Sequence, residues 1–452
     1  MSTHPKRTLI VGGGCFGLSV ALALSKDPNR LVIVFDRDSI PSRDAASNDT
    51  TKAIRADYGD HILYQNLALE ALPLWRMWSK EALRRYGDNV YTESGVLFLC
   101  RDTWTAYERL SFANLGNSRP EGLRAMNGDE IRKEFPQFDR QWNTGYLNRE
   151  GGWCFASRAI QLTADLCQEQ GVKYITGTAG EFKEFIWSEG RINAKDYHGD
   201  WELDDLFSPR NEGHDCSNRA SRHSPSIARI TPSEIPIQCI PHLVWRSLQN
   251  RSSGIFHRMG PFLSVKLTFF CLLGFYGFPA KSNGDLKIAI HSDGYAYTIT
   301  TQDNECVSIP RTSIDHPADT IPSEALARAR DFLRSFLPEL AELEITKAKL
   351  CWYCDSFDGN FIVDHHPQLP GVFVVAGDSG HGMKFLPILG EKVRGILEGD
   401  ADILEKYRTW LWRRPAGNGG LKLNASRVNA GTDERKQLSE LEMARREELN
   451  KG

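Results

Sequence analysis

The feature that most constrains this chain is a glycine-rich turn between two apolar segments near its start. Residues 8–11 are apolar and rich in β-branched side chains, which indicates a buried parallel strand. Gly12, Gly14 and Gly17 follow with the spacing G-x-G-x-x-G, and a helix is expected over 18–25. The first glycine permits a tight turn, the second lets the backbone approach a pyrophosphate, and the third lets helix and strand pack closely. The pattern predicts a dinucleotide-binding βαβ unit.

The second strand of this unit, expected at 31–35, ends at Asp36. An acid at about this offset from the glycines binds the ribose hydroxyls and would repel a 2′-phosphate, which disfavours NADP. The pattern then breaks into a polar loop at 39–48, whereas an NAD-dependent enzyme usually completes its nucleotide domain without interruption. We interpret an apolar strand at 372–376 as a return to the same sheet. A nucleotide domain split in this way favours FAD over NAD.

The composition excludes several classes of partner. The chain has 452 residues, a formal net charge of −3 and 41% hydrophobic residues, which is ordinary for a soluble protein of about two domains. A charge this close to neutral argues against nucleic acid or an anionic membrane as the main partner. Its 10 cysteines show no framework spacing, so we expect a reducing compartment. We expect a monomer whose partners are small molecules.

Two apolar runs could be mistaken for membrane signals. Residues 9–24 follow two basic residues, as in a signal peptide, but the glycine-rich turn assigns them to the nucleotide unit. Residues 267–278 are shorter than the ~20 residues that a spanning helix needs. They also contain Gly274 and Gly277, so we interpret them as a buried strand. The chain ends without a peroxisomal tripeptide, and we expect a cytoplasmic protein.

The remaining elements follow from hydrophobic periodicity. We expect helices at 64–85, 156–170, 323–336 and 384–398, and strands at 172–178, 286–291, 360–364 and 372–376. Gly171 is a candidate C-cap of the second helix. The segment after Pro415 is rich in glycine and asparagine and then strongly charged. We interpret it as a solvated helix or disorder outside the fold.

Four separated motifs contain residues suited to chemistry. Arg55 suits a carboxylate, because its planar fork binds both oxygens. Strand alternation places Lys287 and His291 on one face. Cys351 and Cys354 form a C-x-x-C pair, but a thioredoxin motif would need a helix N-terminus and a zinc site a second ligand pair, so we predict no metal. The motifs are SNDTTKAIRADY at 47–58, GDLKIAIH at 284–291, KLCWYC at 349–354 and GDSGHGMKF at 377–385.

Together the four motifs resemble the amine oxidases of the D-amino acid oxidase superfamily. These include monomeric sarcosine oxidase, fructosyl amino acid oxidase (amadoriase), and saccharopine and pipecolate oxidases. The resemblance covers about 1–195 and 270–415. It implies an α/β fold with a discontinuous Rossmann-like FAD-binding domain and a second, mainly antiparallel β-sheet domain for the substrate. We expect the FAD-binding domain at 1–90, 150–205 and 346–405, the substrate domain at 91–149 and 261–345, an aberrant segment at 206–260, and a C-terminal tail at 406–452.

The resemblance also implies roles for single residues. Lys52 matches a basic residue beside the flavin, and Arg55 and Lys384 match two residues that bind the substrate carboxylate. Lys287 matches a lysine over the flavin that promotes its reaction with oxygen, where a buried cation would stabilise superoxide. Cys351 matches the cysteine that holds FAD covalently through an 8α-S-cysteinyl bond.

The turn at 377–385 is expected to point a helix dipole at the flavin pyrimidine, where reduction places negative charge. His291 is assigned to the catalytic face. The remaining residues assigned to the cofactor are Gly12, Gly14, Gly17, Asp36, Gly380 and Gly382.

The implied reaction is the oxidation of a carbon beside a secondary amine, which gives an imine and hydrogen peroxide. Asn48-Asp49 and the Cys-Trp pair resemble amadoriases, whereas 54–58 and 379–384 resemble saccharopine and sarcosine oxidases. We favour a secondary amino acid of the saccharopine, pipecolate or N-methyl type over a fructosyl amino acid. Both alternatives remain open on the sequence.

The sequence departs from the family between residues 206 and 260. The family has a strand there that ends in a small-residue turn close to FAD, and no such pattern is present. The segment shows little periodicity, and its prolines would interrupt a central strand. It could be a divergent insertion, a disordered loop or retained intronic sequence, and we favour the last. We expect no packed structure there, and an inactive remnant with impaired FAD binding is the alternative function.

Overall fold

The structure is a computed structural model of the chain. It describes residues 6–182 except 137 and 139–140, and then 184–188, 191–196, 199–201, 237–246, 268–271, 274–279, 285–291, 294–300, 304, 306–312, 315–341, 343–356, 358–369, 371–413 and 436–449.

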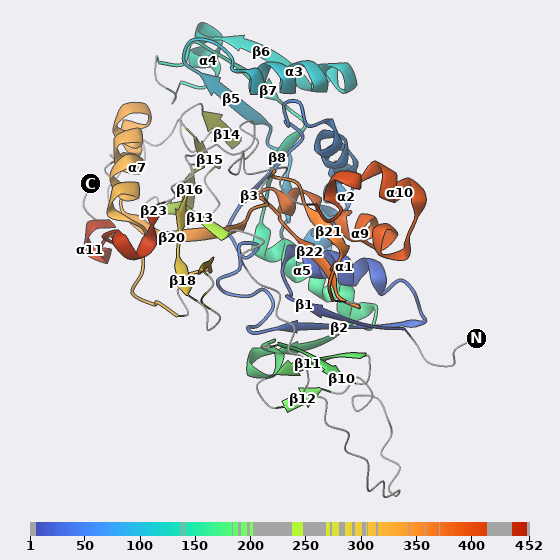
Figure 1. Ribbon diagram of the computed structural model, residues 1–452. Coiled ribbons are helices and arrows are strands. Elements are labelled where there is room, and N and C mark those ends of the chain that lie inside the picture. The colour runs from blue at the N-terminus through green and yellow to red at the C-terminus, as the bar shows by residue number, and fades with distance from the viewer. Residues whose placement is uncertain are drawn as a thin grey trace, which may run out of the picture.

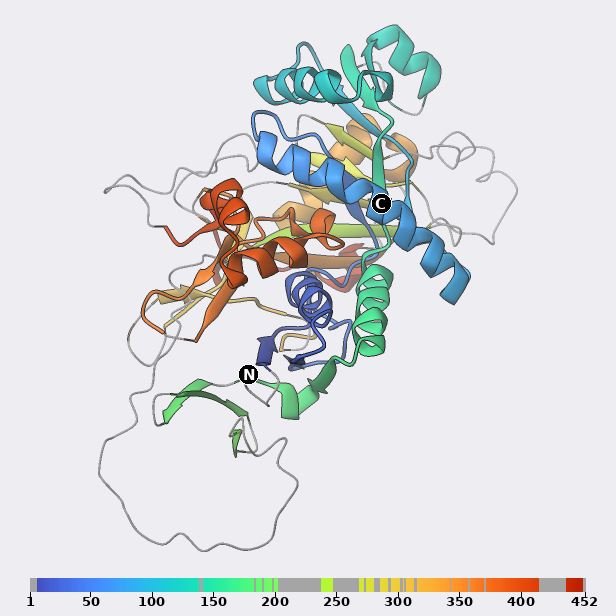
Figure 2. The same cartoon turned by 90° about the vertical axis from the view of Figure 1, so that its right-hand side faces the viewer.

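The nucleotide-binding unit forms as the glycine pattern predicts. Strands β1 (Lys6–Val11), β2 (Arg30–Asp36) and β9 (Lys173–Thr176) form a parallel sheet in the order β1-β2-β9. Helices α1 (Cys15–Leu24) and α5 (Ala156–Glu169) lie side by side on one face of this sheet (Figure 2). A separate three-stranded sheet lies on the side of β2 away from these helices (Figure 1). Its strands are β10 (Glu184–Ser188), β11 (Arg191–Asp196) and β12 (Gly199–Trp201).

One expectation about this sheet is wrong. β22 (Phe373–Ala376) does not join β1, β2 or β9 among the described residues but pairs antiparallel with β21 (Ile362–His365). The two strands are neighbours in sequence, and His366 N–H donates to the Val372 carbonyl at 2.9 Å to close the hairpin. Such local closure costs little loop entropy. The hairpin still packs against the same core as α1.

A second, larger sheet contains 10 strands and is mainly antiparallel, as predicted. Its order is β23-β17-β13-β16-β15-β14-β5-β7-β6, with β20 paired to β13. The strands are β5 (Val96–Cys100), β6 (Leu123–Asn127), β7 (Thr144–Asn148), β13 (Ile237–Arg246), β14 (Thr268–Cys271), β15 (Phe275–Gly277), β16 (Asp285–Ile290), β17 (Tyr295–Ala296), β20 (Ile345–Cys354) and β23 (Lys436–Gln437).

β13 contradicts part of our expectation for 206–260, because its 10 residues form a strand in the middle of this sheet. Its backbone pairs with β16 over 242–246 and with β20 over 237–245. Pro241 lies between the residues paired with β16 and Cys239, which pairs with β17. On that side the strand needs no donor at Pro241, so the proline is tolerated. The rest of 206–260 lies outside the described residues.

The described residues of the apolar run at 267–278 form two strands rather than one, and most of them are buried. β14 and β15 make an antiparallel hairpin. Gly274 stands at the turn with φ 80° and donates its N–H to the Cys271 carbonyl at 3.1 Å. A positive φ is readily adopted only by glycine, so this residue sets the break.

The C-terminal segment also departs from expectation, because residues 436–449 pack on the second domain. β23 pairs with β17, and Leu438 and Leu449 are buried in the core of the large sheet. Arg330 on α7 donates to the Leu449 carbonyl at 2.8 Å. The apolar residues of this charged stretch therefore let it pack against the large sheet. Figure 1 shows α11 (Arg446–Leu449) beside α7 (Ser323–Phe336).

The expected helices form, with one shortened. α2 (Ile62–Tyr86), α5 and α7 match the predictions, and Gly171 follows α5 with φ 84°. α9 (Leu389–Glu398) begins later than the expected 384–398, because residues 382–385 form a 3₁₀ turn. The other short elements are β3 (Lys52–Arg55), β4 (Tyr91–Thr92), β8 (Gly151–Cys154), β18 (Thr298–Thr300), β19 (Cys306–Ser308), α3 (Ala106–Ser118), α4 (Gly128–Glu134), α8 (Pro338–Ala341) and α10 (Ala401–Lys406).

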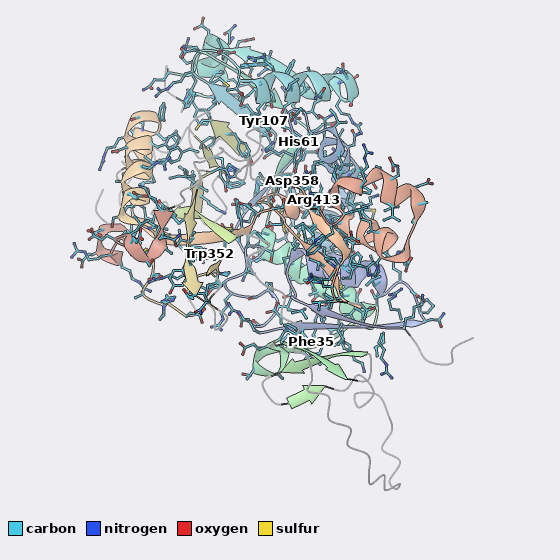
Figure 3. The ribbon with its side chains drawn as sticks, in the orientation of Figure 1. Phe35, His61, Tyr107, Trp352, Asp358 and Arg413 are labelled. Carbon is cyan, nitrogen blue, oxygen red and sulfur yellow. The ribbon has the colours of Figure 1, made fainter. Side chains whose placement is uncertain are left out.

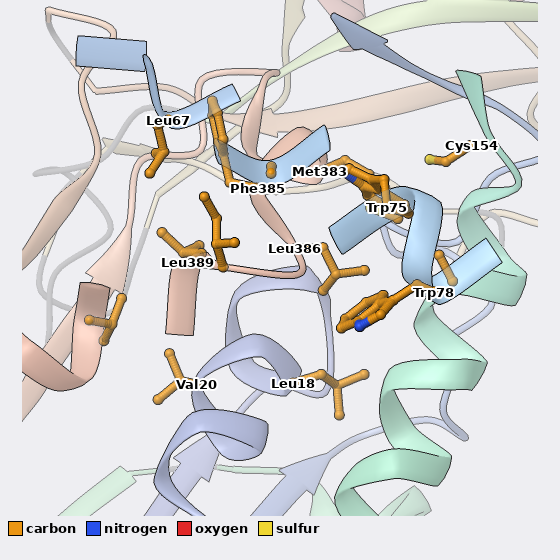
Figure 4. Close-up of a cluster of buried hydrophobic side chains, with 14 of the residues drawn as sticks. Leu18, Val20, Leu67, Trp75, Trp78, Cys154, Met383, Phe385, Leu386 and Leu389 are labelled. Carbon is orange, nitrogen blue, oxygen red and sulfur yellow. The ribbon is translucent and has the colours of Figure 1, made fainter. Parts of the chain in front are cut away.

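The two largest hydrophobic clusters among the described residues lie in different parts of the fold. The first joins α1, α2, α5 and α9, and Figure 4 shows Leu18, Trp75 and Leu389 meeting there from three of these helices. The second lies between α7 and the large sheet, where the rings of Phe275 and Phe332 stack at 4.0 Å. Within the described residues, no helix is long and apolar enough to cross a bilayer.

Candidate active site

The glycine-rich loop has the geometry of a phosphate-binding turn. Gly12 has φ 103°, and a Cβ on Gly17 would lie 1.8 Å from the Gly12 carbonyl oxygen, so both positions require glycine. Gly14 precedes α1 without a side-chain cap. The first N–H groups of the helix are therefore not satisfied by a capping side chain, as in sites that receive phosphate. Asp36 lies at the end of β2 and accepts the Gly13 N–H at 2.8 Å.

A cavity of about 390 Å³ lies between the large sheet, β3 and the turn at 379–384. It brings together predicted site residues from three distant segments, since Lys52, Arg55, His291, Gly380 and Lys384 all line it. Much of the remaining wall is aromatic: Tyr58, Phe98, Tyr107, Phe270, Phe275, Tyr276 and Tyr353. The aromatic wall can enclose an apolar group of a ligand. The basic side chains can bind an anionic group of the same ligand.

Arg55, at the end of β3, is fixed by contacts on several sides. Its Nη1 donates to the Tyr107 hydroxyl at 2.6 Å and to the Asp57 carbonyl. The guanidinium lies over the Phe270 ring, 4.8 Å from its centroid. Burial opposes the charge, but Tyr107 and Asp57 raise the pKa of Arg55 above its usual value. Arg55 is therefore a permanent, preorganised cation at the cavity wall.

Asp57 is buried beside Arg55 and is itself held by hydrogen bonds. Its carboxylate accepts the Tyr146 hydroxyl at 2.9 Å and the Asn148 side-chain amide at 3.0 Å. Burial raises the pKa of this carboxyl above its usual value, while Arg55 and the two hydrogen bonds lower it. The Tyr107 hydroxyl also donates to the Asp57 carbonyl at 2.5 Å. Figure 3 shows Tyr107 at the end of the molecule that carries α3.

Lys384 reaches the cavity from the C-terminal half of the chain. It lies in the 3₁₀ turn before α9 and is buried, with its Nζ 5.8 Å from the centroid of the Tyr58 ring. Its carbonyl accepts the Trp75 indole N–H at 2.8 Å, which ties the turn to α2. Neighbouring His381 contacts the Tyr58 hydroxyl through Nδ1 at 3.2 Å. Arg55 and Lys384 thus present two cations to one cavity.

The turn at 377–385 also touches the nucleotide loop. A Cβ on Gly382 would lie 2.5 Å from the Phe16 ring in the first turn of α1, and one on Gly380 would lie 2.2 Å from the Tyr353 ring. Gly380 has φ 68° and Ser379 has φ 44°. The Ser379 hydroxyl donates to the Gly377 carbonyl at 3.1 Å and so supports this uncommon conformation. The two predicted cofactor-binding turns therefore lie against each other.

Lys287 does not line the cavity but lies behind it. Its side chain is 3% exposed, and its Nζ contacts the Asp49 carboxylate at 2.6 Å and the Thr51 carbonyl at 3.0 Å. Burial lowers the pKa of Lys287 to about 8, and Asp49 opposes that shift. Lys52 also contacts Asp49, at 3.1 Å.

Cys351 lies on β20 next to Lys52. The Lys52 Nζ is 3.2 Å from the Cys351 Sγ. Tyr353 lies two residues further along the strand, and Ala46 packs against both Cys351 and Tyr353. In the described part of the chain, Cys351 and Cys354 are both free thiols. Cys351 is not one of the residues that line the cavity, but it contacts Lys52, which is.

Several residues of the site carry no signal in the sequence. Tyr107 is contributed by α3, and Tyr276 by the short strand β15. Tyr353 could have been found, since strand alternation places it on the same face as Cys351. Asp49 and Asp57 lie within the motif at 47–58, but only packing shows that both are buried charges.

Comparison with known proteins decides the family. The model described as FAD dependent oxidoreductase matches residues 7–194 and 273–394, which is more than half of the chain. This chain belongs to the FAD dependent oxidoreductase family. The predicted resemblance and fold class are confirmed. The match leaves 195–272 uncovered, a stretch that includes the divergent segment at 206–260.

Curated members of this family extend the similarity to nearly the whole chain. L-Saccharopine oxidase of Schizosaccharomyces pombe is 28% identical over 425 residues, covering 90% of this chain and 92% of the relative. Monomeric sarcosine oxidase of Bacillus sp. (strain B-0618) is 25% identical, covering 86% and 91%. The solved structure of fructosyl peptide oxidase from E. terrenum superposes with a TM-score of 0.76 at 20% identity, covering 98% of both chains, which shows the shared fold.

The residues at the nucleotide loop fit the family's cofactor. The uncapped N-terminus of α1 offers N–H groups to a pyrophosphate. Gly12 permits the tight turn, and the missing Cβ atom at Gly17 lets the helix pack against that turn. Asp36, at the end of β2, is the acid that the pattern assigns to a ribose. These features fit FAD, the cofactor of the family to which this chain belongs.

Proposed function

We propose that this chain is an FAD-dependent oxidase of the secondary amine in an amino acid, of the saccharopine, pipecolate or N-methyl type. It would convert the amine to an imine and oxygen to hydrogen peroxide. The relatives named L-saccharopine oxidase, monomeric sarcosine oxidase and N-methyl-L-tryptophan oxidase support this substrate class.

The observation that carries the proposal is the pair of cations in one aromatic cavity. Arg55 and Lys384 are 329 positions apart in the sequence, yet both line the same 390 Å³ space. Two cations held by buried partners suit a carboxylate, since charge-assisted hydrogen bonds are the strong ones. The aromatic wall suits the apolar part of an amino acid and excludes water from the reacting carbon.

The protein's own residues would bind and orient the substrate. Arg55 and Lys384 hold the carboxylate, which places the neighbouring C–N bond in the cavity. FAD, when bound, would supply the redox chemistry, as acceptor of the hydride equivalent from the carbon beside the amine and as donor of electrons to oxygen. We assign no general base, because the amine need only be deprotonated. Lys287 serves the oxygen half as a buried cation. Lys52 and His291 complete the polar part of the cavity wall.

We further propose that FAD is attached covalently through the Cys351 Sγ. The thiol is held on a strand of the large sheet, 3.2 Å from the Lys52 Nζ. The same lysine lines the cavity, so the thiol lies one residue away from the space that the flavin ring would border. Gly12, Gly14, Gly17, Asp36, Gly380 and Gly382 would hold the rest of the cofactor.

A fructosyl amino acid is the second candidate substrate. Solved fructosyl peptide oxidases and amadoriases share the fold at TM-scores of 0.71 to 0.76. Their identities, 19 to 22%, support the fold alone. The Asn48-Asp49 pair favours this alternative from the sequence. The two candidates are distinguished by which of these compounds the enzyme oxidises.

The test is oxygen consumption by the purified chain with a panel of substrates. Saccharopine, pipecolate and N-methyl amino acids should drive oxygen uptake and peroxide formation, with little response to fructosyl valine. Turnover of fructosyl valine alone would reject the substrate class in favour of the second candidate. The absence of turnover with every compound would support the inactive remnant instead.

We propose that the protein works as a monomer, with an amino acid and oxygen as its partners, in a reducing compartment such as the cytoplasm. Seven cysteines whose side chains the structure describes, from Cys15 to Cys354, are free thiols, which fits such a compartment. Light scattering coupled to gel filtration tests the oligomeric state. A mass near 51.0 kDa is expected for one chain.

A further inference from the structure

One buried carboxylate is shared by two lysines behind the cavity. The Asp49 Oδ2 lies 2.6 Å from the Lys287 Nζ and 3.1 Å from the Lys52 Nζ. The side chain of Asp49 is 7% exposed, that of Lys287 3% and that of Lys52 16%. The three groups come from the loop before β3, from β3 itself and from β16. This ion cluster joins the nucleotide-binding part of the chain to the large sheet.

Backbone hydrogen bonds fix the position of Asp49. Its Oδ1 accepts the Thr50 N–H at 2.6 Å. Its carbonyl accepts the Ser157 N–H at 3.0 Å, in the first turn of α5. Lys287 is held from a second direction by the Thr51 carbonyl, at 3.0 Å. The loop therefore fixes the positions of both the Asp49 carboxylate and the Lys287 ammonium that it contacts.

Without Asp49, the ammonium groups of Lys52 and Lys287 would be buried side by side with no carboxylate to offset their positive charge. Two buried ammonium groups repel each other, and burial disfavours each of them. Burial lowers the pKa of Lys287 to about 8, Asp49 opposes that shift, and Lys52 adds to it. For Lys52, Cys351 and Asp49 together outweigh burial and raise the pKa above its usual value. Lys52 is thus a cation throughout the neutral range, and Lys287 is the member that titrates.

We propose that Asp49 is a positioning residue for the oxygen half of the reaction, which holds the Lys287 ammonium in place and keeps it charged beside Lys52. The role of Lys287 in that half rests on the proposed function above. Asp49 acts through Lys287 and is not itself placed against substrate. Under the proposed function Cys351 is joined to FAD as a thioether and carries no charge. The single negative charge of Asp49 then offsets one of the two lysines, so the cluster presents one net positive charge behind the cavity.

The other groups around Lys287 do not replace Asp49. The Phe278 ring lies 5.5 Å from the Lys287 Nζ and carries no net charge. Cys154 and Tyr276 are buried, and burial raises the pKa of each, so both are neutral near pH 7. The titratable or charged groups that interact with the cluster are Asp49, Lys52, Cys351, Cys154 and Tyr276.

The first test follows flavin reoxidation by oxygen against pH in rapid mixing. In the unaltered chain the rate should fall as the pH rises through about 8, because Lys287 loses its proton. Asp49→Asn removes the group that raises this pKa, so the fall should move to lower pH by about one to three units. Lys287→Met should abolish the inflection. Exposed Asp102 supplies the control, since Asp102→Asn should leave the profile unchanged.

Asp49→Glu separates charge from packing. It keeps the carboxylate but lengthens the side chain by one methylene, so the inflection should stay near that of the unaltered chain even if the rate falls. A shift as large as that of Asp49→Asn would contradict the charge argument. An inflection in Asp49→Asn at the same pH as in the unaltered chain would overturn the proposal.

The second test needs no turnover and so stands apart from the proposed function. Thermal unfolding of the full chain is compared for Asp49→Asn and for Asp49→Asn combined with Lys287→Met. At low pH the single variant carries an uncompensated buried ammonium and should melt at a lower temperature than the double variant. The gap should close as the pH rises through the lowered pKa of Lys287, because the amine becomes neutral. A gap of constant size across this pH range would contradict the shared-counterion role even if the enzyme is active. A closing gap in a chain that oxidises no amine would reject only the proposed function.

Discussion

At the scale of single residues, Arg55 is the group whose removal should most affect substrate binding. Arg55→Ala removes one cation of the carboxylate clamp. A lost charge-assisted hydrogen bond costs about 1.5–3 kcal/mol, so KM should rise about 10- to 150-fold. Steady-state kinetics with an amino acid substrate measures this. Arg119→Ala is the matched control, because Arg119 is 52% exposed and makes only a long ion pair with Glu150. An unchanged KM in Arg55→Ala would reject its role.

Cys351 gives a second prediction at this scale. After acid precipitation, yellow colour should stay with the protein in the unaltered chain and move to the supernatant in Cys351→Ser, because serine cannot form the thioether. Cys354→Ser is the control, since it changes the other cysteine of the C-x-x-C pair and should keep the colour in the pellet. Flavin released from the unaltered chain would show that no covalent bond forms.

The sequence predicted some of these residues for physical reasons that apply locally. Gly12 and Gly17 were identifiable because the turn and the contact of helix with strand each exclude a side chain. The pairing of Lys287 with Asp49 could not be read from the sequence. It depends on two segments 238 positions apart that meet only in the folded chain. An isolated strand lysine gives no indication that it is buried.

At the scale of elements, the contact between α1 and α9 is the closest helix packing beside the nucleotide loop. A Cβ on Gly390 would lie 1.8 Å from the Ser19 carbonyl oxygen. The Ser19 hydroxyl also accepts the Gly390 N–H at 2.8 Å and donates to the Leu386 carbonyl at 2.7 Å. Gly390→Ala should therefore push the helices apart, as overpacking does, at a cost of about 1–3 kcal/mol.

Denaturant unfolding measures this loss, and flavin content reports whether α1 has moved. Gly116→Ala on α3 is the control, because the nearest atom to its added Cβ would be 4.0 Å away. Alanine should stabilise that helix position by about 0.5–1 kcal/mol. Equal stability of Gly390→Ala and the unaltered chain would show that the helices can separate without cost.

Elements with strong periodicity were predictable, and those set by pairing were not. α5 and α7 formed at the expected residues because a single apolar face defines each helix. β22 was assigned to the wrong sheet, because a short apolar strand does not reveal its partner. β13 was missed because Pro241 and the prolines before the strand argue against a central strand, yet Pro241 falls where one neighbour is not paired.

At the scale of the whole molecule, the C-terminal segment 436–449 stabilises the second domain. It buries Leu438 and Leu449 against the large sheet and contacts α7 through Arg330. Burial of one leucine is worth about 1.5–3 kcal/mol, so deletion of 436–452 should cost at least about 3 kcal/mol. The midpoint of thermal unfolding should fall, whereas a chain lacking only 451–452 should keep it. An unchanged midpoint after the longer deletion would show that the segment adds no stability.

The divergent middle of the chain bears on whether the molecule is active. β13 lies between β16 and β20, the strands that carry Lys287 and Cys351. Its backbone pairs Val244 with Lys287 and Ile240 with Cys351. Loss of this strand would disturb both residues at once. An inactive remnant would thus differ from an oxidase in the amount of flavin it binds as well as in its turnover.

The absorbance spectrum of the purified chain under anaerobic conditions shows whether the chain is a flavin-dependent amine oxidase. Flavin absorbance should be near one equivalent per chain, bleach on addition of a secondary amino acid and return when oxygen is admitted. Flavin that fails to bleach with saccharopine, pipecolate or N-methyl amino acids, or a chain purified without flavin, would contradict the proposed function.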